Sequence, residues 1–115
     1  MNDNGLKPRV NMKLPKKIQV GGTDIDVLIV DDIEGGLMGE SLLCSGTIKI
    51  ARKSKGYPQS DSVMLNTFVH ECVHMILDSM GDTELSGNEK FVNTFAGFTT
   101  EIIRSIMREN NEQDV

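Results

Sequence analysis

Two histidines and a glutamate form the pattern in this chain that could do chemistry. The only histidines are His70 and His74, and Glu71 lies between them. Residues four apart share one face of an α-helix, so both imidazoles can reach one metal ion. The helical period turns Glu71 about 100° from His70, which places its carboxylate beside the metal. The pattern predicts a zinc site with Glu71 as general base, the alternative being two hydrogen-bonded core histidines.

A zinc ion held by two histidines needs a third protein ligand if one position is to stay open for water. The chain has no third histidine and no suitable cysteine. The remaining candidates are the acidic residues after the motif: Asp78, Asp82, Glu84, Glu89 and Glu101. We expect Glu89, because it lies at the edge of the apolar face of a second helix and can face the first. The alternative is that Glu89 is a first-turn acid favoured by the helix dipole.

The chemistry that these residues predict is hydrolysis. Zinc would polarise a scissile carbonyl and lower the pKa of bound water. Glu71 would accept the proton of that water and pass it to the leaving amine. Asp78, one turn after His74, could orient a ligand imidazole, or it could simply end the helix.

Two helices are expected to carry the candidate ligands. The first covers residues 61–80, with Ser60 or Asp61 as its N-cap and Gly81 as its stop. Apolar residues cover most of its circumference, so we expect burial on nearly every side. It leaves one polar stripe: Asn66, Thr67, His70, Glu71, His74 and Asp78. Such a stripe on a buried helix indicates a cleft or a metal site. After a short loop, the second helix covers residues 88–109.

The first half of the chain predicts a small sheet. Two β-branched runs, at residues 18–20 and 23–30, flank a Gly-Gly turn that is typical of hairpins. A second pair, at residues 37–44 and 47–51, flanks a Ser-Gly turn. We expect an α+β fold, in which three or four mostly antiparallel strands form a twisted sheet packed on both helices. We place residues 47–51 at the sheet edge beside the cleft, where they would pair with an extended peptide.

Length, charge and cysteine content limit the class of protein. The 115 residues have the size of one domain, and we expect an arm at 1–13, the domain at 14–109 and a frayed tail at 110–115. The net charge of −5 argues against a general nucleic-acid binder. Cys44 and Cys72 form no metal-type pair, and no run resembles a signal peptide or a membrane span. We expect a cytoplasmic monomer that needs no membrane.

The motif and the residues after it resemble a known arrangement. His70 to His74, followed by residues 88–96 (NEKFVNTFA), is similar to the gluzincin pattern of HExxH on one helix and Glu on the next. It resembles the ImmA/IrrE-like and minigluzincin-type metallopeptidases, small proteins common on phages and mobile elements. The resemblance covers residues 14–106, with HExxH as its most specific part. It implies a zincin-like fold, zinc bound by His70, His74 and Glu89, and an endopeptidase that acts on a peptide or protein.

The resemblance also implies a tyrosine or histidine that hydrogen-bonds the tetrahedral intermediate. Tyr57, in the loop before the first helix, is the single candidate, although it can also be an ordinary loop aromatic. Without such a donor, the same fold would serve as a weakly active or inactive zinc-binding module that regulates or binds a partner. A third class, a DNA-associated protease of the SprT-like type, would need a basic surface that the composition does not provide.

Overall fold

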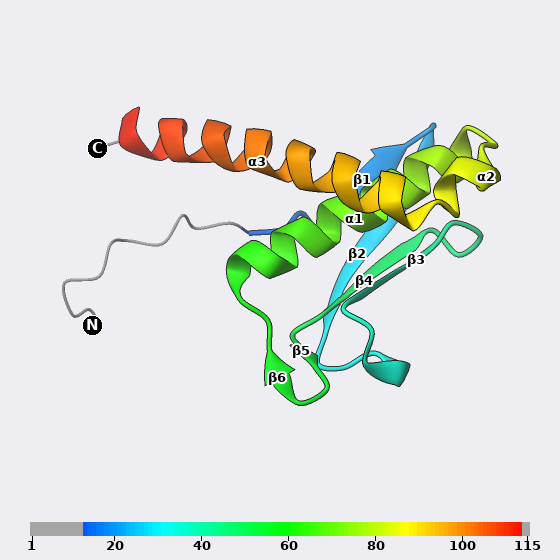
Figure 1. The fold of residues 1–115 in the computed structure, drawn as a ribbon, viewed down its shortest axis with the longest axis horizontal. Helices are drawn as coiled ribbons and strands as arrows, with labels where there is room; N and C mark the ends of the chain where they lie inside the picture. The colour runs from blue at the N-terminus through cyan, green and yellow to red at the C-terminus, as the bar shows by residue number, and fades with distance from the viewer. Residues whose placement is uncertain (1–12, 114–115) are drawn as a thin grey trace.

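The fold has three layers, which are a β-sheet, helix α1 and helix α3 (Figure 1). The structure is a computed structural model that describes residues 13–113, so most of the expected arm and the end of the expected tail lie outside the described residues. α1 (Asp61–Ser79) lies between the sheet and α3 (Glu89–Gln113), which runs back along it. This arrangement confirms the predicted α+β class.

Four strands form the main sheet, in the order β1-β2-β4-β3. β1 (Lys17–Val20) pairs antiparallel with β2 (Thr23–Val30), and β2 pairs parallel with β4 (Thr47–Ala51). β3 (Gly39–Leu42) pairs antiparallel with the other side of β4. The sheet is therefore mostly antiparallel, as predicted, but it is mixed because β2 and β4 run in the same direction.

The turns and short elements complete the sheet layer. Gly21 and Gly22 join β1 to β2 with φ angles of 58° and 82°, the left-handed conformation that a two-residue hairpin turn requires. A short 3-10 helix, η1 (Glu34–Gly36), separates β2 from β3. A separate hairpin of β5 (Lys53–Ser54) and β6 (Tyr57–Pro58) follows β4.

The prediction that Thr47–Ala51 forms the sheet edge is wrong. This strand, β4, is central, because β2 and β3 pair with its two sides. Alternating apolar residues indicate which face of a strand is buried, but the same alternation occurs at the edge and at the centre of a sheet. The edge strands of this sheet are β1 and β3, and β3 lies against α1 at Glu71.

α1 begins and ends where local signals predict. The Ser60 hydroxyl accepts the backbone N–H of Val63 and caps the N-terminus. Gly81, with a φ of 80°, follows the C-terminus. Both ends agree with the prediction to within one residue.

Two hydrophobic clusters place α1 in the middle layer. One joins α1 to α3 through Leu65, Val69, Val73, Leu77, Val92 and Ala96. The other joins α1 to the sheet through Met75, Ile25, Ile48 and Ile50. The helix is less enclosed than predicted, because Val63 and Ile76 are exposed.

α3 is longer and less buried than predicted. It reaches Gln113, beyond the expected end at residue 109. Val92 and Ala96 pack against α1, whereas a neighbouring stripe is 51–65% exposed: Phe95, Phe98, Ile102 and Ile106. A helix that packs on one neighbour buries one side only, so the apolar residues beside that contact stay in solvent. Neither α3 nor any other helix within residues 13–113 combines the length and the apolar character needed to cross a bilayer.

Candidate metal centre

α1 presents His70 and His74 on one side, one helical turn apart. The centroids of the two rings are 4.9 Å apart, and the ring planes meet at 68°. Both side chains are partly buried, and the Nε2 atoms of both rings face the first residue of α3. The predicted placement of two imidazoles around one space is therefore present.

Glu89, the first residue of α3, completes the group from the second helix. Its Oε1 lies 3.5 Å from Nε2 of His70, and its Oε2 lies 3.4 Å from Nε2 of His74. One ligand atom from each of the three residues lies within 4.8 Å of the others, so the group could hold a metal ion. Neighbouring ligand atoms in a tetrahedral zinc site, with bonds of about 2.0–2.1 Å, are about 3.3–3.4 Å apart. The Glu89 oxygens lie at about this distance from the two imidazole nitrogens, and imidazole and carboxylate are among the ligand types that zinc takes.

A short capped segment brings Glu89 to this position. α2 (Thr83–Ser86) lies where a loop was predicted, and the Asp82 side chain caps it. The Asn88 side chain then accepts the N–H of Phe91, so that α3 begins at Glu89. Glu89 is thus in the first helical turn, where the dipole also favours an acid, and this role is compatible with metal binding.

Ser86, at the end of α2, contacts the second histidine. Its Oγ lies 3.0 Å from Nδ1 of His74, and Ser86 is buried. The backbone carbonyl of Asp78 accepts the N–H of Gly81, so Asp78 lies in the last turn of α1. Among residues 13–113, the side chain that hydrogen-bonds the His74 imidazole is therefore Ser86.

Glu71 lies beside the histidines and is only 7% exposed. Burial raises the pKa of Glu71, while a hydrogen bond from the Ser41 side chain and the nearby His70 and His74 act in the opposite direction. A carboxylate with a raised pKa takes up a proton more readily near neutral pH, which suits general-base chemistry. Glu71 does not belong to the group of possible ligands, so its carboxylate is available for this role.

β3 crosses α1 so closely at Glu71 that position 39 has no room for a side chain. A Cβ on Gly39 would lie 2.6 Å from Cγ2 of Thr67 and 3.2 Å from Cγ of Glu71. Gly39 and Ser41 share one face of the strand, so both meet α1. Sequence reasoning missed both residues, and the glycine within a predicted strand was the one available signal of a close approach.

A pocket of about 200 Å³ opens beside Glu71. Its lining residues are Met38, Gly39, Asn66, Thr67, His70, Glu71 and Asn93. Part of the predicted polar stripe of α1 therefore faces a cleft. Asn93, one turn after Glu89 on α3, was not predicted as a site residue, although the helical period places it on the same side as Glu89.

Tyr57 and the cysteines lie outside this centre. Tyr57 is in β6, is 77% exposed and does not line the pocket, so its contact with a reaction intermediate stays a prediction. Cys44 and Cys72 are free thiols. Burial raises the pKa of the Cys72 thiol to about 12, so Cys72 stays protonated near neutral pH.

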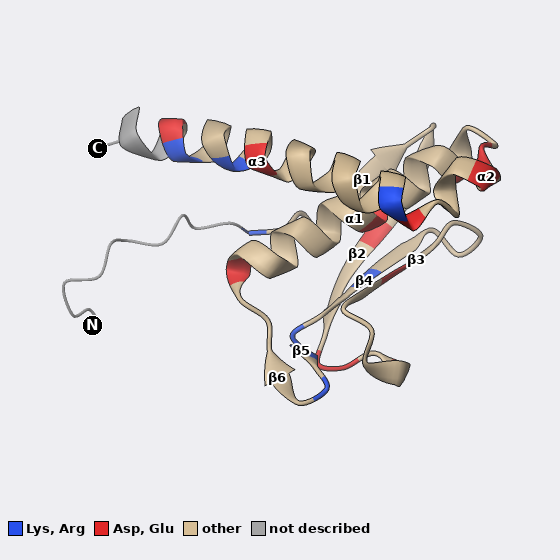
Figure 2. Ribbon diagram, viewed as in Figure 1, with Lys and Arg blue, Asp and Glu red and all other residues tan. Residues whose placement is uncertain are grey.

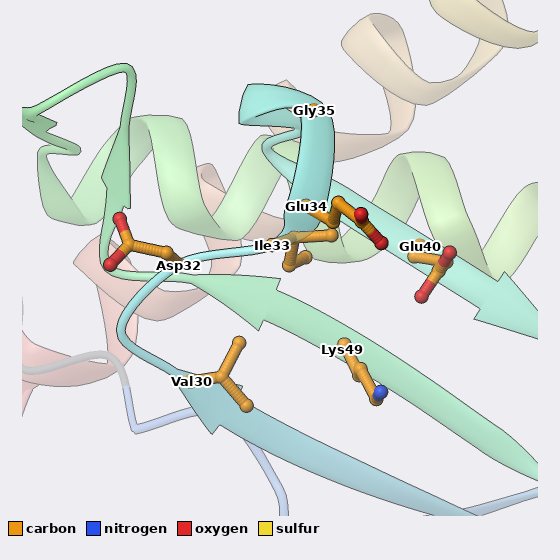
Figure 3. A pocket seen from close by; sticks show the side chains of 7 residues that line it. All are labelled: Val30, Asp32, Ile33, Glu34, Gly35, Glu40 and Lys49. Carbon is orange, nitrogen blue, oxygen red and sulfur yellow. The ribbon is translucent and has the colours of Figure 1, made fainter.

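A larger pocket, of about 340 Å³, lies on the other face of the sheet (Figure 3). Its lining residues are Val30, Asp32, Ile33, Glu34, Gly35, Glu40 and Lys49. Ile48 and Ile50 pack in the cluster with α1, so Lys49 between them points away from α1. This pocket contains no residue of the His70/His74/Glu89 group.

Comparisons with protein-family models, curated proteins and solved structures found no match. Any functional interpretation therefore depends on the residues of the site and on the fold. The structure has an α+β fold, and its His70/His74/Glu89 group resembles an HExxH-plus-Glu zincin site.

Proposed function

We propose that the protein is a zinc-dependent endopeptidase with Glu71 as its general base. The observation that carries the proposal is the position of buried Glu71, which adjoins both the His70/His74/Glu89 group and a polar pocket. Zinc bound by this group would supply Lewis-acid activation of water and of the scissile carbonyl. The Glu71 carboxylate would accept a proton from the attacking water and deliver it to the leaving amine.

The position of β3 supports a peptide or unfolded protein segment as the substrate. β3 is an edge strand with a sheet neighbour on one side, and its Gly39 and Ser41 reach Glu71. An extended peptide can add to such an edge through backbone hydrogen bonds. This mode of binding recognises an extended chain and would bring its backbone next to the general base.

The ligand set, the charge distribution and the free cysteines support three further parts of the proposal, which are a monomer, a peptide as the partner and a reducing compartment. All three ligands come from one chain, which supports a monomer as the functional unit. Figure 2 shows Lys and Arg spread over α3, β4 and the β5–β6 hairpin, which supports a peptide and not a nucleic acid or a membrane as partner. The free thiols of Cys44 and Cys72 fit a reducing compartment such as the cytoplasm.

The position of Tyr57 favours a second candidate function. Tyr57 is exposed and outside the pocket, and no tyrosine is among the pocket residues. Without a tyrosine donor, another group would have to stabilise the oxyanion that forms during hydrolysis. The same zinc site would then belong to a weakly active or inactive module that regulates or binds a partner.

Glu71→Gln separates the two functions. The change keeps the shape of the side chain and removes the basic oxygen, so zinc content should stay near wild type while cleavage falls about 10²- to 10⁴-fold. Elemental analysis measures the zinc content of each variant. Mass spectrometry of a denatured protein substrate after incubation with each variant measures cleavage. Glu84→Gln, at an exposed acid of α2, is the matched control. Equal cleavage by wild type and Glu71→Gln would exclude Glu71 as the base. Zinc in both proteins without cleavage would favour the regulatory module.

A further inference from the structure

The imidazole of His74 has a polar partner at each of its ring nitrogens. The Ser86 Oγ lies 3.0 Å from Nδ1, and the carboxylate of Glu89 lies 3.4 Å from Nε2. Ser86 is buried and His74 is largely buried, so water has little access to replace the serine hydroxyl. A buried ring nitrogen that lost this partner would remain unsatisfied, which is unfavourable.

Ser86 is itself held in position by α2. Its backbone N–H donates to the carbonyl of Asp82, whose side chain caps the same helix. Leu85 packs against the cluster that α1 and α3 share. Glu89 follows only three residues after Ser86, so one short segment carries both the hydroxyl at Nδ1 of His74 and the third possible ligand.

The two histidines differ in this respect. The His70 side chain lies near the Glu89 carboxylate and the His74 ring, which it meets in an edge-to-face arrangement. Within residues 13–113, no side-chain hydroxyl bonds His70 in the way that Ser86 bonds His74. Of the two histidines, His74 is therefore the one whose ring nitrogen Nδ1 has a hydroxyl partner among the described residues.

We propose that Ser86 is a positioning residue of the metal site. A neutral imidazole that binds a metal through Nε2 has its ring proton on Nδ1, and the Ser86 hydroxyl would accept the hydrogen bond of this proton. The contact holds the ring in the direction that leaves Nε2 available to the metal, together with Glu89. The inference rests on the metal site of the proposed function, but it does not require that peptide bonds are cleaved.

Ser86→Ala tests this role through zinc binding. Loss of the hydroxyl should weaken zinc binding about 10- to 100-fold, which competition with a chromophoric chelator measures. In the zinc-loaded wild type, the Nδ1 proton of His74 should be visible by NMR at the chemical shift of a hydrogen-bonded imidazole proton, and in Ser86→Ala this signal should move away from that shift. Ser86→Thr keeps the hydroxyl and should retain both properties. Ser105→Ala is the matched control, because the exposed Ser105 hydroxyl donates to the backbone of Glu101 within α3.

Zinc affinity and an Nδ1 proton signal equal to wild type in Ser86→Ala would overturn the proposal. If Ser86→Ala did not fold, Ser86→Cys would replace it, since it keeps the volume and weakens the hydrogen bond, and unchanged affinity there would also overturn the proposal. A wild-type protein that binds zinc but cleaves nothing would contradict the proposed peptidase and leave the role of Ser86 intact. A wild-type protein that binds no zinc would contradict both.

Discussion

Glu89, on α3, lies beside both histidines of α1, so the His70/His74/Glu89 group connects the two helices. Its carboxylate lies 3.5 and 3.4 Å from the imidazoles of His70 and His74, although its side chain is 62% exposed. Exposed ion pairs typically contribute about 0–1 kcal/mol to stability. A small contribution to folding is a weak reason for one exposed carboxylate to meet two imidazoles, and the arrangement is the one that a shared metal ion would need.

Glu89→Gln should therefore lower zinc affinity with little effect on the metal-free fold. An amide is a poor zinc ligand, so the loss should exceed the about 10- to 100-fold loss expected for an orienting residue such as Ser86. Glu84→Gln changes an exposed acid on α2 that is not part of the group, and it should bind zinc as wild type does. Chelator competition gives the dissociation constants of all three proteins. Equal constants would remove Glu89 from the site.

The assembly of the His70/His74/Glu89 group was predictable at the residue scale because a helix has a fixed period. His70 and His74 are four residues apart, Glu89 lies at the edge of an apolar helix face, and the structure brings all three together. Ser41 and Ser86 could not be inferred in this way. Their contacts depend on how β3 crosses α1 and on how α2 turns, and no local periodicity indicates either.

At the scale of elements, the two ends of α1 were more predictable than the neighbours of strands. The cap at Ser60 and the stop at Gly81 each depend on about one helical turn of sequence. The neighbours of β4 depend on the longer path through η1, which places β3 on the outer side of β4. α2 was missed because a helix of four residues is too short to show a period.

Alanine at two glycine positions should have opposite effects on stability, because only one of them lies where β3 closely approaches α1. Gly39→Ala would place a Cβ 2.6 Å from Cγ2 of Thr67, so the strand must shift and the free energy of unfolding should fall by about 1–3 kcal/mol. Gly97→Ala is the control, because a Cβ at this α3 position meets no neighbouring atom within 4 Å. The higher helix propensity of alanine should raise stability there by up to about 1 kcal/mol. Urea unfolding followed by circular dichroism measures both changes, and a Gly39→Ala protein as stable as wild type would contradict the close approach.

In the whole molecule, α3 is attached mainly through its first half. Val92 and Ala96 belong to the cluster with α1, whereas Phe98, Ile102 and Ile106 are exposed further along the helix. The His70/His74/Glu89 group lies at the end of α3 that packs against α1, where Glu89 is the first residue of the helix. A metal ion there would connect α1 to α3 beside their buried contact. The three candidate ligands are assembled only in the folded chain, so metal binding would be linked to folding.

Zinc should therefore stabilise the whole domain. A ligand that binds only the folded state adds about 4 kcal/mol at a free concentration 1,000 times its Kd. For a domain of this size, that contribution should raise the Tm by more than about 10 °C relative to protein in EDTA, measured by thermal unfolding. Glu71→Gln should show the wild-type rise and Glu89→Gln a much smaller one, because only the second variant loses a ligand. A full rise in Glu89→Gln would mean that zinc stabilises the domain from another site, and the connection between α1 and α3 would not be its cause.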